Sequence, residues 1–270
     1  MKLGIVLSTR DYDGTGQGFA DAMRAVEDEG LDGLWFFDAI GRGYLNPDPI
    51  GGASAAAALT RRIEIGTCIV QVPLRNPIEL AQRVLTTHHL SEGRFSFGVG
   101  AGSTEADFKS LGQDFQGRFK ALEDGIATMQ ALWRGETVNG MNLSPWPAVV
   151  GGPPILIGSW AGGRWIRIAA KKHAGWIGSA MYTNIAALKD GVTRFKADGG
   201  KRAIATNIHV DLSASGGGKL SDDDKIDLRC SPAVAKDRLK LLQDAGFDDA
   251  ILVVADHSAA NLAAVRALLQ

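Results

Sequence analysis

Residues able to bind a phosphate group follow one of the apolar runs in this sequence. The segment 158–163 (GSWAGG) continues from the run 154–158 (PILIG), and a helix-like pattern begins directly after it. Backbone amides at the N-terminus of a helix attract anions, and the hydroxyl of Ser159 adds a donor. The glycine pair at 162–163 lets a ligand approach the backbone closely. We expect this segment to bind phosphate, the alternative being a plain glycine-rich start of a helix.

A second glycine run, 98–105 (GVGAGSTE), follows another apolar stretch. It does not match the dinucleotide-binding fingerprint, because the third glycine of that motif is missing. Closely spaced glycines remove side chains where the backbone must approach something flat or bulky. The run therefore indicates either a close ligand contact or a tight turn between a strand and a helix.

The remaining polar candidates are few. Asp38 ends the run 33–38, where a carboxylate can meet a ligand or cap the next turn. His88 and His89 are adjacent in a helical pattern, and adjacent residues do not share a helix face, so we do not expect a common metal. Cys68 and Cys230 match no metal-binding spacing, which predicts reduced thiols. With no metal cluster or Ser-His-Asp arrangement in the sequence, we expect a bound organic cofactor to do the difficult chemistry.

Eight strand-like runs alternate with amphipathic segments and would position these residues. Several of the runs are apolar throughout, as is typical of parallel strands buried on both faces. Eight strand–helix units in 270 residues favour a closed (β/α)8 barrel, with its chemistry at the C-terminal ends of the strands. Composition does not change along the chain, so we expect 1–270 to be one domain. The strand runs are 2–8, 33–38, 62–72, 94–100, 154–158, 175–180, 203–212 and 249–254; helices are expected at 17–29, 117–134, 231–245 and 258–269, and irregular segments at 137–153 and 213–224.

Composition argues against several classes of protein. The chain is 45% apolar and 22% charged, with a formal net charge of -1. No basic surface is expected to attract nucleic acid or anionic lipid. No apolar run approaches the length of a membrane span, and no signal peptide precedes the first strand. We therefore expect a cytoplasmic protein.

Several segments, in this order, resemble the luciferase-like monooxygenase family. They are 62–67 (RIEIGT), 73–77 (PLRNP), 90–100 (LSEGRFSFGVG), 105–108 (EADF) with 111–112 (LG), 132–133 (LW), 153–159 (PPILIGS), 174–176 (AGW) and 231–232 (SP). The matches extend over nearly the whole chain. The resemblance implies a (β/α)8 barrel that binds FMN or the deazaflavin coenzyme F-420 at its C-terminal mouth, acts on a small molecule and forms a homodimer.

The resemblance also implies which residues hold the cofactor. A cis non-proline peptide under the flavin ring would fall at Thr67-Cys68, at the end of the third strand. Asp38 matches a carboxylate at the end of the second strand, and Asp107 an acidic position near the ring; these two are the candidates for catalysis. The other expected cofactor-binding residues are Gly100, Arg118, Gly158, Ser159, Ala161, Gly162 and Gly163. No metal is expected.

Among the positions that depart from the family pattern, three bear on the chemistry, and His88 replaces a usual aspartate as a structural change. Ala39 stands where many relatives have histidine, and Gly100 and Ala101 stand where luciferases have cysteine and arginine. These differences argue against light emission, and they leave no acid–base residue to carry over. The chain is also short for the family, so we expect reduced loops over the substrate pocket.

We therefore expect a monooxygenase that uses dioxygen and reduced FMN, the latter supplied by a separate NAD(P)H-dependent flavin reductase. The first alternative is an F-420-dependent oxidoreductase that transfers hydride without oxygen. A non-catalytic flavin-binding barrel and a non-redox barrel that binds a phosphorylated metabolite are further alternatives.

Overall fold

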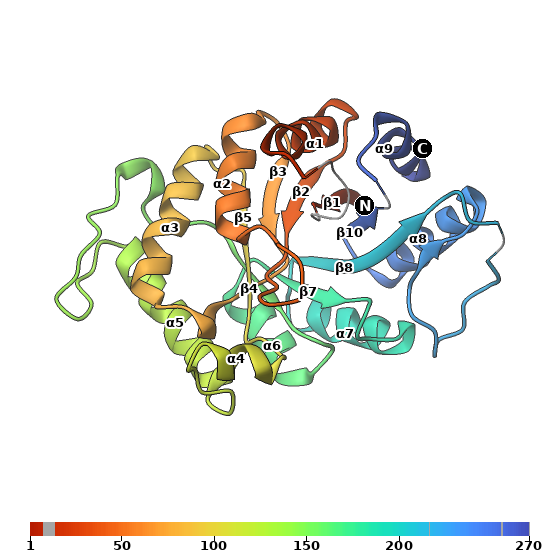
Figure 1. The fold of residues 1–270 in the computed structure, drawn as a ribbon. Coiled ribbons are helices and arrows are strands. Elements are labelled where there is room, and N and C mark those ends of the chain that lie inside the picture. The colour runs from red at the N-terminus through yellow and green to blue at the C-terminus, as the bar shows by residue number, and fades with distance from the viewer. Residues whose placement is uncertain (8–13, 216, 255, 270) are drawn as a thin grey trace.

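A computed structural model describes residues 1–7, 14–215, 217–254 and 256–269 of the chain. Parallel strands form a closed barrel with helices around it (Figure 1). The barrel closes because the last strand pairs with both the first strand and β8. The barrel strands are β1 (Lys2–Val6), β2 (Gly33–Phe36), β3 (Glu64–Thr67), β5 (Phe95–Gly100), β6 (Ile155–Gly158), β7 (Gly175–Ser179), β8 (Arg202–Asp211) and β10 (Asp249–Val254). Two short strands, β4 (Val70–Gln71) and β9 (Leu228–Arg229), pair with β5 and β8.

Local sequence explains where several helices begin and end. Asp48 caps α2 by accepting hydrogen bonds from two amides of its first turn, and Asn76 caps α3 in the same way. Gly246 ends α8 with a φ of 106°, which a side chain would strain. The α-helices are α1 (Gly16–Asp28), α2 (Pro49–Leu59), α3 (Pro77–Leu90), α4 (Glu105–Ser110), α5 (Arg118–Trp133), α6 (Gly163–Lys172), α7 (Ile185–Ala197), α8 (Pro232–Ala245) and α9 (Ala259–Arg266). The 3-10 helices are η1 (Val72–Leu74), η2 (Pro147–Val149) and η3 (Ala267–Leu269).

The structure confirms the predicted (β/α)8 fold. Each of the eight predicted strand runs coincides with one barrel strand to within a few residues, and the run 62–72 divides into β3 and β4. The segment 137–153 is irregular, as predicted, apart from one bridge between Val138 and Met141 and the short η2. None of the helices among the described residues is long and apolar enough to cross a membrane. That residues 1–270 form one domain stays a prediction.

One tryptophan fills the centre of the barrel. Trp35 is fully buried and belongs to the inner apolar cluster. A Cβ atom added to Gly4, Gly33 or Gly66 would lie 2.6, 2.8 or 2.2 Å from the indole. Real Cβ atoms do not approach so closely, so these three strands need glycine where the indole lies.

An ion cluster closes the N-terminal end of the barrel. Arg202 of β8 binds Glu64 of β3 at 2.6 Å and Asp249 of β10 at 2.7 Å. Burial opposes the charge of Arg202, but its hydrogen bonds to Asp249 and Glu64 outweigh this effect and raise its pKa. The charged groups at this end are thus bound to one another. A cofactor site is expected at the opposite end, the mouth, where the strands end.

Candidate functional site

The expected phosphate cradle lies at the mouth, where β6 leads into α6. The Ser159 amide donates to the Ile177 carbonyl at 3.1 Å, which holds the segment against β7. The Trp176 indole donates to the Ser159 hydroxyl at 3.0 Å, so the hydroxyl keeps its own hydrogen for another acceptor. Gly162 is the N-cap of α6, and no side chain caps this helix. The Gly162 amide donates to the Trp160 carbonyl, whereas the first amides of the helix itself, from Gly163 onward, have no side-chain cap and are open to an anion.

Arg118, the first residue of α5, lies beside this cradle. The Phe119 ring contacts the Trp165 ring of α6 with 6.2 Å between centroids, so the two helices start side by side. The Arg118 guanidinium lies over Phe115 at 3.9 Å and donates to the Phe115 carbonyl at 2.8 Å. Its buried Nε has no hydrogen-bond partner among the described residues. A buried donor in this state is poised for an acceptor such as a phosphate oxygen.

Asp38 lies just beyond the end of β2, and both oxygens of its carboxylate accept hydrogen bonds. Arg75 donates to both carboxylate oxygens, at 2.5 and 3.0 Å, and the Gln71 amide donates to one of them at 2.9 Å. Burial lowers the pKa of Arg75, but its hydrogen bonds to Asp38 and the charge of that carboxylate raise it overall. Asp38 therefore joins the end of β2 to the β4–η1 segment.

Asp107 is engaged in the same way from α4. Arg42 donates to both of its carboxylate oxygens at 2.7 Å and to the Thr104 hydroxyl at 3.2 Å. The hydrogen bonds to Asp107 raise the pKa of Arg42. Arg42 belongs to the loop 38–48 between β2 and α2, which crosses in front of the barrel strands in Figure 1. The ion pair thus fixes this loop to the far side of the mouth.

The cis peptide bond lies one residue later than predicted. It joins Cys68 to Ile69, not Thr67 to Cys68. The physical reason is that Thr67 is still part of β3, in register with Phe36, and the Cys68 amide donates to the Phe36 carbonyl. Regular strand geometry therefore extends through Thr67, and the chain departs from it only beyond Cys68.

The glycines at the ends of β5 and β6 make room for this β3–β4 segment. A Cβ at Gly98 would lie 1.8 Å from the Thr67 carbonyl oxygen, and one at Gly100 would lie 2.9 Å from the Ile69 side chain. A Cβ at Gly158 would lie 2.4 Å from the same isoleucine. Packing within the chain thus accounts for glycine at these positions, whether or not a ligand also lies there.

Both cysteines are free and buried. Burial raises the pKa of the Cys68 thiol to about 12, and the nearby Thr206 hydroxyl only partly offsets that effect. A thiol with such a pKa stays protonated at neutral pH and is a poor nucleophile.

A polar cluster that β8 brings to the mouth had no counterpart among the sequence-based expectations. Thr206 and Asn207 stand opposite the single β10 residue Ile251, so β8 bulges here. Asn207 has a φ of 60°, and its side-chain amide donates to the Ser179 hydroxyl at 3.0 Å. Bulges occur next to active sites, where they redirect side chains.

His209 follows the bulge and also faces the mouth. It is in register with Val253, which packs against the inner apolar cluster. Burial raises the pKa of nearby Asp227, but the hydrogen bonds and the charge of Arg229, with a smaller contribution from nearby His209, lower it overall. The sequence analysis predicted a functional role for neither His209 nor Arg42. The Gly-Arg-Gly sequence around Arg42 could have indicated an arginine in a turn, whereas nothing in the sequence indicated the bulge before His209.

The structure is thus a closed (β/α)8 barrel whose mouth carries a helix start without a side-chain cap and a floor packed against glycines. Residues 1–217 match the luciferase-like monooxygenase family. The chain belongs to this family, as its ordered motifs indicated.

Two relatives and one solved structure show the range of similar proteins. Limonene 1,2-monooxygenase of Rhodococcus erythropolis is 38% identical over 85 residues, which are 32% of this chain and 22% of that protein. F420-dependent glucose-6-phosphate dehydrogenase of Amycolatopsis mediterranei is 33% identical over 126 residues, 44% of this chain and 38% of that protein. The aligned segments thus span less than half of either relative.

The oxygenating constituent of 3,6-diketocamphane monooxygenase from Pseudomonas putida, solved in complex with FMN, has the same fold. Its TM-score is 0.76 at 16% identity, with 98% of this chain and 96% of that chain covered.

Proposed function

We propose that this chain is an FMN-dependent monooxygenase, which uses reduced FMN and dioxygen to oxygenate a small organic substrate. The choice of FMN rests on one observation: three cations around the cradle are already paired with carboxylates. Arg164 pairs with Glu123 at 2.5 Å, Arg194 with Asp190 at 2.6 Å, and Lys120 with Asp124 at 2.7 Å. A carboxylate thus already neutralises each of these three cations.

The two candidate cofactors differ beyond the phosphate group. FMN ends at its phosphate, whereas coenzyme F-420 continues into an acidic tail of glutamyl residues. Such a tail would have to compete with Glu123, Asp190 and Asp124 for these cations. The pairings therefore favour FMN, while the name of the F420-dependent relative keeps hydride transfer as the alternative.

The residues at the cradle fit a terminal phosphate. The Ser159 hydroxyl, the amides of Ala161 and Gly163, and the Arg118 guanidinium would hold it, whereas the Gly162 amide, also expected from the sequence, donates to the Trp160 carbonyl.

The flavin ring would lie over the floor of the mouth. Thr67, Cys68 and Ile69 form this floor, and Gly100 and Gly158 leave room for it. Reduced FMN would supply the electrons that activate dioxygen for transfer of one oxygen atom to the substrate.

Asp38 and Asp107 would act as positioning residues. Through Arg75 and Arg42 they hold the loop 38–48 over the mouth, where it would exclude water from the bound ring.

We also infer the partners and setting of the enzyme. The glycines of 98–105 pack against the chain's own β3–β4 segment and do not form a dinucleotide fingerprint. This packing supports a separate NAD(P)H-dependent reductase as the source of reduced FMN. A homodimer in the cytoplasm is proposed from the family resemblance.

The proposal is tested by anaerobic titration with reduced FMN and, in parallel, with reduced F-420, followed by absorbance. We expect micromolar binding of FMN, about 10-fold or more weaker in Arg118→Ala, because a charge-assisted hydrogen bond contributes about 1.5–3 kcal/mol. Arg134→Ala is the matched control: Arg134 follows the other end of the same helix and pairs with Glu136. Tighter binding of F-420, or binding of neither cofactor, would contradict the proposal. Oxygen uptake with reduced FMN then tests the oxygenase step.

A further inference from the structure

Large apolar side chains are exposed along the rim of the mouth. They come from three loops that follow β2, β6 and β7, and not from the outer faces of the helices. Folded proteins rarely expose neighbouring apolar side chains unless the surface binds something. These residues are Ile40, Leu45, Trp160, Met181 and Tyr182.

Two of these side chains form an aromatic wall. The rings of Trp160 and Tyr182 stack with 5.1 Å between centroids and an interplanar angle of 30°. Trp160 is 52% exposed and Tyr182 is 57% exposed, so much of the stacked pair is open to solvent. Trp160 is also part of the cradle, between Ser159 and Ala161. A substrate bound next to a cofactor in the cradle would therefore lie beside this wall.

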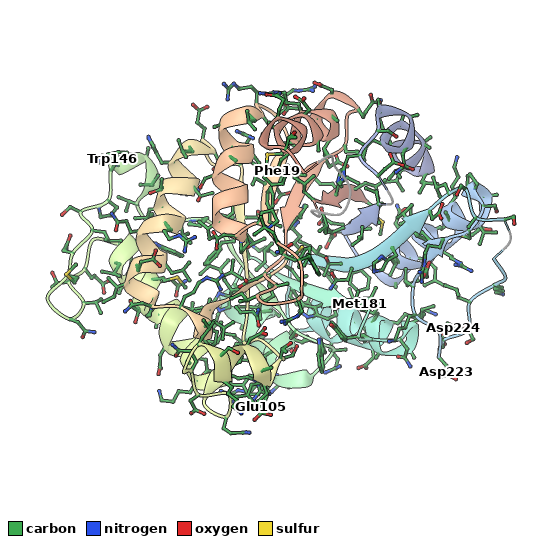
Figure 2. The ribbon with its side chains drawn as sticks, in the orientation of Figure 1. Phe19, Glu105, Trp146, Met181, Asp223 and Asp224 are labelled. Atoms are coloured by element: carbon green, nitrogen blue, oxygen red, sulfur yellow. The ribbon has the colours of Figure 1, made fainter. Side chains whose placement is uncertain are left out.

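The loop 38–48 lies near the aromatic wall. Arg42, at the tip of this loop, is close enough to Tyr182 of the β7–α7 loop for an electrostatic interaction. Met181, at the start of the β7–α7 loop, lies near the centre of the molecule in Figure 2. Ile40 is two residues from Arg42 and adds an exposed apolar side chain to the loop. The mouth is thus bordered by the stacked aromatic rings and by a partly apolar loop.

The charges closest to this space are already paired. Asp107 binds both terminal nitrogens of Arg42, and Arg75 binds both oxygens of Asp38. An anionic substrate would have to displace Asp107 from Arg42, or compete with the cofactor phosphate for Arg118, before it gained a cation. A neutral ring displaces neither partner, and it gains apolar burial and stacking on the aromatic pair.

We propose that the substrate site lies between the Trp160–Tyr182 pair and the loop 38–48, and that it accepts a flat, uncharged, apolar ring compound. This inference rests on the proposed function for the location of the cofactor. It names the substrate class and excludes phosphorylated sugars and other anions. Trp160 and Tyr182 would be the residues that determine specificity.

The test measures binding of 2-naphthol by calorimetry to the full chain, without cofactor and with FMN. We expect Trp160→Ala and Tyr182→Ala each to weaken binding about 10-fold, and Tyr182→Phe, which keeps the ring, to bind as the unchanged chain does. Trp146→Ala is the matched control, because Trp146 is 64% exposed on a loop far from the mouth (Figure 2). The charged analogue 2-naphthoate should bind at least 10-fold more weakly than 2-naphthol.

Three results would overturn the inference: equal binding of 2-naphthoate, unchanged naphthol affinity in both alanine variants, or loss of affinity in Trp146→Ala. Sedimentation of the same variants adds a further check. If Trp160→Ala dissociates a dimer without changing naphthol affinity, the wall is a contact between subunits. The titration with reduced FMN separates this inference from the proposed function. A chain that binds naphthol as expected but not FMN keeps the site and loses the cofactor assignment.

Discussion

The ion pair between Arg42 and Asp107 predicts that its two alanine variants differ in cost. The Asp107 side chain is 4% exposed and the Arg42 side chain is 33% exposed. Arg42→Ala would leave a carboxylate that water cannot reach. Asp107→Ala would leave an arginine that already contacts solvent and can swing outward, because Gly41 and Gly43 flank it with positive φ and open space. Arg42→Ala should therefore destabilise the chain more.

The size of each effect depends on burial. Breaking a fully buried ion pair by removing one partner costs about 3–5 kcal/mol. Because a third of Arg42 is exposed, we expect about 2 kcal/mol for Arg42→Ala. For Asp107→Ala we expect about 1 kcal/mol, the usual loss of hydrogen bonds whose partner finds water. The double variant should cost about 1 kcal/mol, so that Asp107→Ala rescues Arg42→Ala. At this chain length, about 2 kcal/mol corresponds to a fall in Tm of about 5 °C.

The assay combines calorimetric Tm and urea unfolding with thermolysin cleavage in the loop 38–48. We expect faster cleavage near Ile40 and Leu45 in Arg42→Ala than in Asp107→Ala. Arg24→Ala is the control, because Arg24 and Asp21 form an exposed pair, for which the expected loss is below about 0.5 kcal/mol. The reasoning is refuted if Asp107→Ala costs as much as Arg42→Ala, or if the double variant is less stable than Arg42→Ala.

The barrel supports three further predictions. Burial raises the pKa of the Glu64 carboxyl, but hydrogen bonds from Arg202 lower it overall. The ionised Glu64 therefore stabilises the folded chain fully above the unfolded pKa of about 4.3, and this stabilisation is lost as pH falls through the lower folded pKa. Urea unfolding of Glu64→Gln should therefore depend less on pH in this acid range, and an unchanged slope would contradict the assignment. The Cys68 thiol, with a pKa of about 12, should resist iodoacetamide at pH 8 in the folded chain and react after unfolding, as mass spectrometry can show. Gly158→Ala should cost about 1–3 kcal/mol by overpacking against Ile69, and Ile69→Ala should relieve much of that cost; a neutral Gly158→Ala in urea unfolding would show that the floor is not tightly packed.

The fold could be predicted because its signal is local. Each barrel strand is a short apolar run, and each run is bounded by turn residues within a few positions. The run 62–72 was predicted as one strand but forms two, because the chain leaves strand geometry between Thr67 and Val70. Nothing in the residue types of Cys68 and Ile69 marks that point. The predicted position of the cis bond was therefore wrong by one residue.

The candidate site was only partly predictable because its pairings are not local. Arg42 and Asp107 are 65 positions apart, and Asp38 and Arg75 are 37 apart. Sequence patterns identified both aspartates but neither arginine, so the carboxylates looked available for chemistry. The glycines led to the opposite error, because they looked free of contacts within the chain. Their spacing indicated space for a ligand, while Gly98 and Gly100 also face side chains or backbone of the neighbouring segment.

The engaged aspartates change how the mouth is expected to work. A general acid or base needs a carboxylate whose proton can be exchanged with the substrate. Asp38 and Asp107 each accept hydrogen bonds from both terminal nitrogens of one arginine instead, and each of these ion pairs connects the loop 38–48 to a different part of the barrel. Their substitution should therefore alter the position and closure of that loop before it alters any proton transfer. Under the functions proposed above, the two carboxylates that first suggested catalysis would instead support the loop beside a neutral pocket, while a bound cofactor would carry the chemistry and the aromatic wall would select the substrate.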